Sequence, residues 1–224
     1  MLYLNNMSYR GNANVLRSFY AKYGLGYFFD RDNQYLESAF NDITRLWVEN
    51  LDQINEVRFI MIAEAPLWGQ VQKYIYNPNI KSSVFFYCND LRDALHCEIK
   101  DKRDFLLKCQ DIGLVIVDIS PFALNSRDTA ITYREMGKKK YRQLVEHTIP
   151  SFFEKKIEAI CAKKAKRVKV FFRYKTVKDT FQDLVSRVLI ANDIIKSELD
   201  ILDVSGDNMP MDRKKLRSII NPDK

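Results

Sequence analysis

The sequence predicts an α/β protein, a three-layer α/β/α sandwich built on a four-stranded parallel sheet. Two apolar runs carry this prediction, Val57–Ala63 (VRFIMIA) and residues 113–119 (GLVIVDI). Both are short, continuous and rich in β-branched residues, as strands buried on both faces of a parallel sheet are. Long segments of helical periodicity separate the strand-like segments. Crossovers of that length join parallel strands and place helices on both faces of the sheet.

The remaining elements follow in order along the chain. Apolar residues at helical spacing predict an amphipathic helix over residues 34–51, which leads directly into the first strand. Thr176 and Asp179 have the spacing of a capping box at the start of a helix. We further expect a charged helix over residues 89–108, basic helices over 130–147 and 151–164, strands over 167–174 and 198–204, and a last helix over 213–220.

The first 33 residues differ in character from the rest. They are polar and aromatic, and Gly24-Leu25-Gly26 interrupts any regular element. We therefore expect residues 1–33 to form an N-terminal extension that packs on a single domain of residues 34–224.

Composition restricts the class of protein. With 224 residues, 46% of them hydrophobic, the chain can bury a core without disulfides or metals. No apolar run approaches the ~20 residues of a membrane span, and the first residues lack a signal-peptide pattern. Four cysteines without a C-x-x-C pair and only two histidines argue against a metal centre. We expect a cytoplasmic (intracellular) monomer with reduced thiols, no cofactor, no metal and no membrane partner.

The formal charge of +7 is concentrated in one part of the chain. Residues 134–178 hold fifteen lysines and arginines against four acids, an excess of +11. Such an excess is the electrostatic signature of a polyanion partner, here a nucleic acid and most simply DNA. The alternative is that lysine-rich helices only provide solvated faces. The candidate phosphate-binding residues are Lys138, Lys139, Lys140 and Arg142.

Acidic residues end both apolar runs. The first stops at Glu64-Ala65-Pro66, where proline cannot continue a central strand, and the second ends at Asp118. The carboxyl ends of parallel strands are where open α/β sheets bind ligands. The aromatic residues of segment 74–87 would suit a flat ligand such as a nucleobase. Glu64 is alternatively a solvated residue after a core strand, and Asp118 a cap for the turn at Ser120.

These residues resemble motifs of the uracil-DNA glycosylase superfamily, a four-stranded parallel α/β/α sandwich. Residues 63–67 (AEAPL) are similar to the GEAP-type first motif, and residues 113–124 (GLVIVDISPFAL) are similar to the segment that ends in the base-reading residue. The resemblance runs from about residue 34 to the C-terminus. Ala63 replaces the leading glycine of the first motif. The third motif falls at residues 205–211, where Met209-Pro210-Met211 stands in place of the leaving-group histidine.

The resemblance implies cleavage of the N-glycosidic bond of a flipped base. Glu64 would position or deprotonate the water. Tyr76, or secondarily Phe85, would stack on the base, although each is equally well explained as a core residue. Asp118 would accept hydrogen bonds from the base edge. The Asn208 side chain, or the amides of residues 206–208, would stabilise the departing base.

Two other functions remain open. Loss of the histidine favours a catalytically weak or inactive module of the same fold that binds nucleic acid or a base. An enzyme acting on free nucleotides or nucleosides is the third alternative, in which the basic span has no role.

Overall fold

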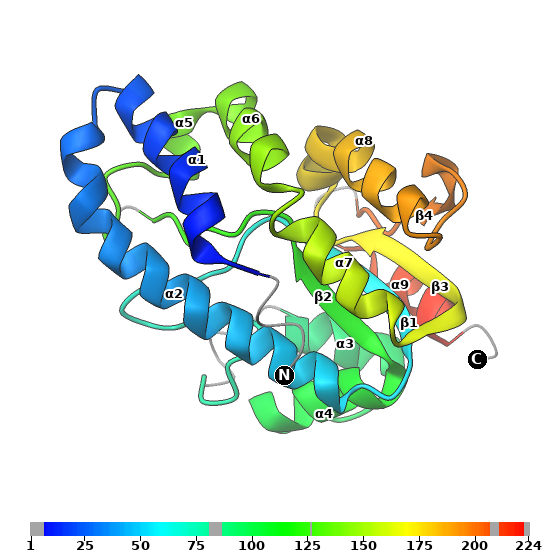
Figure 1. Cartoon of the computed structure of the whole chain (residues 1–224). Helices are drawn as coiled ribbons and strands as arrows, with labels where there is room; N and C mark the ends of the chain where they lie inside the picture. Colours follow the sequence, from blue (N-terminus) through cyan, green and yellow to red (C-terminus); the bar gives the residue numbers. More distant parts are fainter. Residues whose placement is uncertain (1–6, 81–86, 126, 207–210, 222–224) are drawn as a thin grey trace.

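The computed structural model describes residues 7–80, 87–125, 127–206 and 211–221, and its centre is a parallel sheet (Figure 1). The four strands are β1 (Val57–Ala63), β2 (Leu114–Asp118), β3 (Lys164–Phe172) and β4 (Ile201–Leu202), in the spatial order β2-β1-β3-β4. All neighbouring strands are parallel. The predicted α/β class and four-stranded parallel sheet are therefore confirmed.

The carboxyl ends of the three longest strands lie level with one another. Ala63 of β1 is opposite Asp118 of β2, and Ile62 is opposite Phe172 of β3. The chain places β2 on one side of β1 and β3 on the other, so the strand order reverses between β1 and β3. This reversal is the topological switch point at which open α/β sheets bind ligands.

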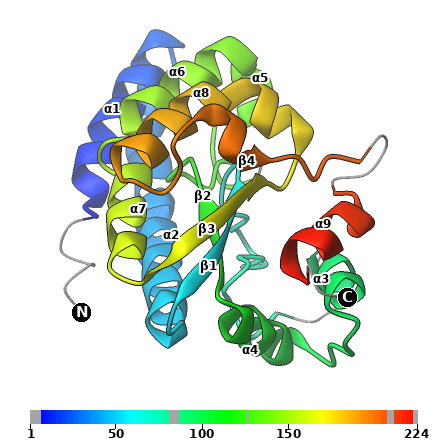
Figure 2. The same ribbon diagram turned by 90° about the vertical axis from the view of Figure 1, so that its right-hand side faces the viewer.

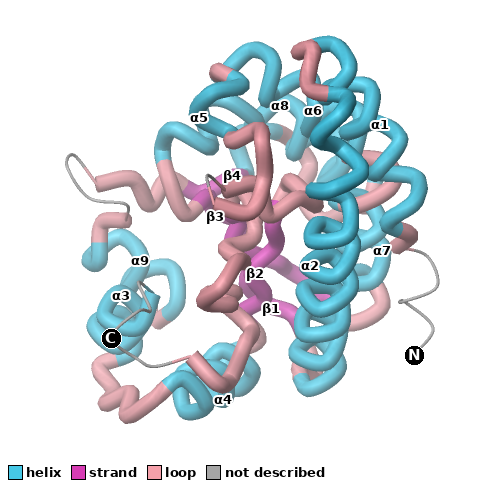
Figure 3. The backbone as a smooth tube through the Cα atoms, turned by 90° about the vertical axis from the view of Figure 1, so that its left-hand side faces the viewer, coloured by secondary structure: helices cyan, strands magenta, loops and turns pink. Residues whose placement is uncertain are grey.

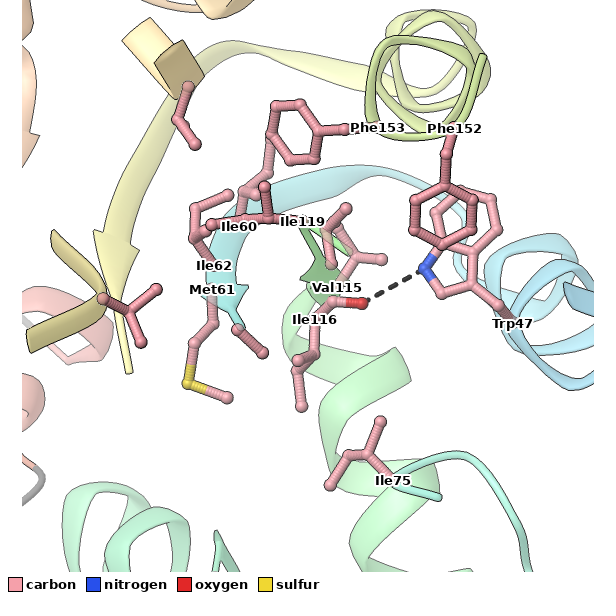
Figure 4. Close-up of a cluster of buried hydrophobic side chains, with 14 of the residues drawn as sticks. Trp47, Ile60, Met61, Ile62, Ile75, Val115, Ile116, Ile119, Phe152 and Phe153 are labelled. Atoms are coloured by element: carbon pink, nitrogen blue, oxygen red, sulfur yellow. Dashed lines mark hydrogen bonds between the residues drawn. The ribbon is translucent and has the colours of Figure 1, made fainter. Parts of the chain in front are cut away.

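Helices cover both faces of the sheet (Figure 2). One face carries α2 (Gly26–Gln53) and α7 (Phe153–Cys161), and the other carries α3 (Tyr87–Leu95), α4 (Lys102–Ile112) and α9 (Arg213–Ile220). The fully buried Trp47 packs over the strands together with Phe152 and Phe153 at the start of α7 (Figure 4). This aromatic layer lies between the sheet and the helices α2 and α7 (Figure 4).

The open edge of β2 is closed by side chains. The Trp47 indole N–H donates to the Ile116 carbonyl at 3.1 Å. The Tyr76 hydroxyl donates to the same carbonyl at 3.1 Å and accepts from the Ile116 N–H. An edge strand with unpaired backbone groups is a template for pairing with another chain, and these contacts remove that possibility at Ile116.

The first 33 residues are more regular than expected. Residues Tyr9–Lys22 form α1, and α2 begins at Gly26, so α2 runs through the expected boundary between residues 33 and 34. The turn between the helices contains Gly24 in the left-handed region, with φ of 71°. Tyr20 donates to Asp32 at 2.9 Å, and α1 lies beside α2 as a helical hairpin (Figure 3).

Backbone conformation divides two of the predicted helices. The segment expected as one helix from residue 130 is α5 (Tyr133–Met136) and α6 (Lys138–Thr148), separated by Gly137 at φ 73°. The charged segment before β2 is α3 and α4, separated after His96 at φ 50°. A positive φ ends a right-handed helix, and this signal was present in the sequence only at Gly137.

Other boundaries shifted. The helix α8 (Lys175–Ala191) has Tyr174 as its N-cap without a side-chain bond, so the capping box predicted at Thr176 is wrong. The strand β3 begins three residues earlier than expected. The fourth strand has only two residues, because a short 3₁₀ turn, Glu198–Asp200, precedes it. No helix among the described residues has the length and apolarity needed to cross a membrane.

Candidate functional site

Glu64 follows the last residue of β1, next to the switch point. Its backbone carbonyl accepts a hydrogen bond from the Ser120 N–H at 3.0 Å, which joins the loops that follow β1 and β2. The residue is half-buried, and desolvation raises the pKa of its carboxyl. A carboxyl group in such an environment releases its proton at a higher pH than an ordinary glutamate.

Two tyrosines are near enough to Glu64 for its charge to affect them, and Ser120 is bonded to its backbone; we call Glu64, Ser120, Tyr133 and Tyr141 the Glu64 cluster. Tyr133 on α5 and Tyr141 on α6 pack with ring centroids 4.4 Å apart. Tyr133 Oη lies 3.3 Å from Ser120 Oγ and also donates to the Phe122 carbonyl. Burial raises the pKa of both tyrosines, and the nearby Glu64 and Asp118 carboxylates raise it further. Both phenols therefore stay protonated and can act as hydrogen-bond donors.

Asp118 ends β2 but points into the core. Its Oδ2 lies 3.9 Å from Lys156 Nζ on α7, and the two side chains are 4% and 0% exposed. The Lys156 ammonium lies 4.9 Å from the centroid of Trp47 and 4.3 Å from that of Phe152. At 3.9 Å the pair is too long for a hydrogen bond, and neither atom has another such partner among the described residues.

Burial moves both groups of this pair towards their neutral forms. Desolvation raises the pKa of Asp118, while Lys156 and a hydrogen bond from Tyr74 oppose the rise. Desolvation likewise lowers the pKa of Lys156 from 10.5 to about 8. Asp118 therefore pairs with Lys156 inside the core. In the turn that Asp118 was alternatively expected to cap, the Ser120 N–H donates to the Glu64 carbonyl.

Tyr76 is also part of the core. Its side chain is 2% exposed, its ring lies edge-on to Tyr74 at 5.7 Å, and its hydroxyl bonds to Ile116. In this arrangement it presents no open face on which a base could stack. Phe85 and Asn208, the other two predicted site residues, lie outside the described residues.

The candidate phosphate-binding residues fall into two groups. Lys138, Lys139 and Lys140 are exposed in the first turn of α6, directly before Tyr141. Arg142 instead forms a two-pronged ion pair with Asp183, at 2.8 and 2.6 Å, and also donates to the Thr180 carbonyl. Arg142 is therefore already engaged within the protein.

The three lysines adjoin the end of the helical hairpin. Lys140 Nζ lies 4.4 Å from the centroid of Tyr23, whose hydroxyl donates to the Met136 carbonyl at 3.5 Å. One turn further, Tyr27 is 90% exposed and Phe28 is 36% exposed, with their ring centroids 5.5 Å apart. We call Lys138–Lys140 together with Tyr27 and Phe28 the basic–aromatic face.

Other cations of the basic span stabilise helix ends. Lys163 Nζ donates to the carbonyls of Leu51, Asp52 and Ile54 at the end of α2. Lys164 donates to two carbonyls after α8, and Lys169 donates to one at the end of α9. A positive group at a helix C-terminus is favourable because the helix dipole is negative there. The span is therefore not one continuous cationic surface.

A pocket that the sequence patterns do not predict lies between the loops that follow β1 and β2. This Trp68 pocket has a volume of about 220 Å³, and its walls include Trp68, Val71, Lys73, Arg127 and Asp128. Trp68-Gly69, directly after the end of β1, marks one wall of the pocket in the sequence. The opposite wall lies about 57 residues further along the chain, and no sequence pattern connects the two.

No group of three or more His, Cys, Asp or Glu residues in the described part of the chain could hold a metal ion. The chain was also compared with known proteins. No family model matches it, and neither the curated proteins nor the solved structures contain a significant match.

Proposed function

We propose that this protein binds DNA and hydrolyses the N-glycosidic bond of an extruded, modified base, as a uracil-DNA glycosylase-like α/β/α protein. The observation that carries the proposal is the position of Glu64. A half-buried carboxyl group with a raised pKa follows the central strand at the switch point, and protonated tyrosine hydroxyls lie close by.

The Glu64 cluster has the groups that this reaction needs. The bond breaks through an oxocarbenium-like sugar while negative charge develops on the departing base. Glu64 would hold or deprotonate the attacking water, and its raised pKa makes it a stronger base than an ordinary glutamate. The Tyr141 hydroxyl could donate towards the departing base, a role for which the matching segment has no histidine, whereas the Tyr133 proton is already donated to the Phe122 carbonyl.

The basic–aromatic face supports a nucleic-acid substrate. Three exposed lysines stand in the helical turn before Tyr141, Lys140 contacts Tyr23 at the end of the helical hairpin, and two exposed aromatic rings follow Tyr23 in the sequence. Cations that follow a phosphate backbone and rings on which bases stack are the common features of single-strand binding surfaces. The face would hold the strand while the target base reaches Glu64.

The test is abasic-site formation on oligonucleotides that carry uracil, hypoxanthine or another lesion. Glu64→Gln keeps the shape of the side chain and should lower the rate by ~10²–10⁴, the usual contribution of a general base. Replacing Lys138, Lys139 and Lys140 by glutamate should weaken binding and reduce its salt dependence. Lys166→Glu, at an exposed position on β3, is the matched control. A rate that is the same in Glu64→Gln would refute the assignment.

A second candidate is a binding module without efficient catalysis. The burial of Tyr76 and Asp118 favours it, because the two side chains expected to hold a base are engaged in the core. It predicts salt-dependent binding of oligonucleotides with no abasic product from any lesion.

A further inference from the structure

We propose that the Trp68 pocket binds one nucleotide of the DNA strand beside the target base, with the base against Trp68 and the phosphate at Lys73 and Arg127. This inference rests on the proposed function, since it adds a second contact for the same strand. It concerns a site on the loops after β1 and β2, distinct from the Glu64 cluster.

Asn125 holds the two walls of the pocket together. Its Oδ1 accepts from the N–H groups of Arg127 and Asp128 at 2.9 and 3.0 Å. Its Nδ2 donates to Tyr35 Oη at 3.0 Å and lies 3.5 Å from the Trp68 carbonyl. All of these bonds are internal, so Asn125 is a structural residue that presets the pocket before any ligand arrives.

Gly69 permits the close approach of the walls. Its φ is 148°, and an added Cβ would lie 3.0 Å from Asp128 Oδ2. A side chain at this position would strain the backbone and crowd the carboxylate.

The lining has the chemistry of a nucleotide. The Trp68 ring is only partly buried, and Leu67 and Val71 beside it are 49% and 55% exposed, so the pocket has an apolar side. Lys73 and Arg127 are exposed cations, while the half-buried Asp128 can accept hydrogen bonds from base N–H groups. The volume of about 220 Å³ is below the ~300–1,000 Å³ of drug-sized sites and suits a single base with its phosphate outside.

The position fits a neighbouring nucleotide of the same strand. Trp68 is four residues from Glu64, a span of at most ~14 Å even for extended chain. A strand rises ~3.4 Å per nucleotide in a duplex, so the two sites are within about four nucleotides of each other.

Tryptophan fluorescence can test this proposal directly. The chain has two tryptophans, and Trp47 is 0% exposed, so a base that quenches emission must act at Trp68. The probes are an unmodified thymidine octanucleotide and free thymidine monophosphate, and fluorescence anisotropy of a labelled octanucleotide measures total binding. We expect quenching by the octanucleotide that Trp68→Phe removes, with weaker quenching by the monophosphate.

The variants separate stacking from charge. Trp68→Ala should weaken octanucleotide binding about 5- to 150-fold, the range for one lost base–aromatic stack. Lys73→Gln and Arg127→Gln should each lower the slope of log affinity against log salt by ~0.7. Lys166→Gln, on the distant β3, should change neither quantity.

The outcomes distinguish the two proposals. The pocket assignment is overturned if Trp68→Ala and Arg127→Gln bind the octanucleotide with wild-type affinity by anisotropy and the emission of the wild-type protein is not quenched. That result would leave DNA binding itself intact. Tighter binding of the monophosphate than of the octanucleotide overturns the flanking-nucleotide assignment. Quenching at Trp68 without abasic product from any lesion supports the pocket and refutes only the glycosylase reaction. No anisotropy change with any oligonucleotide overturns both.

Discussion

The buried pair of Asp118 and Lys156 allows a quantitative test of the core. Lys156→Met fills most of the same space but leaves the Asp118 carboxylate alone in a site where it is 4% exposed. Removing one partner of a buried ion pair typically lowers the free energy of unfolding by ~3–5 kcal/mol. Replacing both, as Lys156→Met with Asp118→Asn, removes the unpaired charge and should recover a large part of this loss. We expect a coupling free energy near ~3 kcal/mol, the upper end for interacting residues.

The effect of pH has a defined sign. Lys156 loses its proton at about pH 8 in the folded protein, compared with 10.5 in the unfolded chain. The folded state therefore carries a desolvation cost for the charged ammonium below about pH 8, which Lys156→Met relieves while it loses the attraction to Asp118, and this cost disappears as pH rises towards 10.5. In Lys156→Met, the raised pKa of Asp118 loses the opposing attraction of the ammonium and rises further. Stability of that variant should then fall as pH rises from about 4 through the raised pKa of Asp118.

Urea unfolding at pH 5 and pH 8 measures both effects. Trp47 lies 4.9 Å from Lys156 and is fully buried, so its fluorescence reports the loss of this part of the core. We expect Lys156→Met to be more destabilised at pH 8 than at pH 5. If the two single substitutions were additive and the loss independent of pH, the pair would not interact and the reasoning would be refuted.

Three further predictions concern stability. Tyr76→Phe removes the hydroxyl bonded to both backbone groups of Ile116, so it should lower the free energy of unfolding by ~1–3 kcal/mol without changing oligonucleotide binding. Weaker oligonucleotide binding at unchanged stability would instead support Tyr76 as a base-stacking residue. Gly113→Ala places a Cβ 2.3 Å from the Glu56 carbonyl oxygen, at a φ of 74°. It should lower the melting temperature more than Gly137→Ala, the matched control, where φ is 73° but no atom lies within 4 Å of the added Cβ. Equal decreases in melting temperature would contradict the packing argument. Lys163→Met removes the ammonium bonded to the last carbonyls of α2 and should lower the free energy of unfolding in urea by ~1–2 kcal/mol, whereas Lys166→Met should leave it unchanged. An unchanged free energy of unfolding in Lys163→Met would show that this cap does not stabilise the protein.

The elements that the sequence predicted best are those whose signals are local. The run Val57–Ala63 is β1 to the residue, because a buried strand and the following proline both act within a few positions. The last helix, Arg213–Ile220, also has the expected bounds, and the Asp212 side chain caps its first turn. The helix α1 was missed because its stability comes from contacts with α2 such as Tyr20 to Asp32, which periodicity does not reveal.

The candidate site was predictable in position but not in composition. An acid after a central strand must lie at the carboxyl edge of the sheet, which is where Glu64 is found. The direction of Asp118 depends on Lys156, a residue 38 positions later whose charge the sequence assigned to the surface. Lys163, Lys164 and Lys169 donate to backbone carbonyls at or just after helix ends, and a count of charged side chains in the sequence does not include such acceptors.

Lys163, which directly precedes β3, and Lys164 and Lys169 within it also connect this strand to helices on both faces of the sheet. Two are consecutive in sequence and end at α2 and α8, and the third ends at α9. Separating β3 from the sheet would expose the last carbonyls of all three helices at once. We therefore expect the layers to unfold as one cooperative unit, in which amide hydrogens in the final turns of α2, α8 and α9 exchange with solvent together with those of β3.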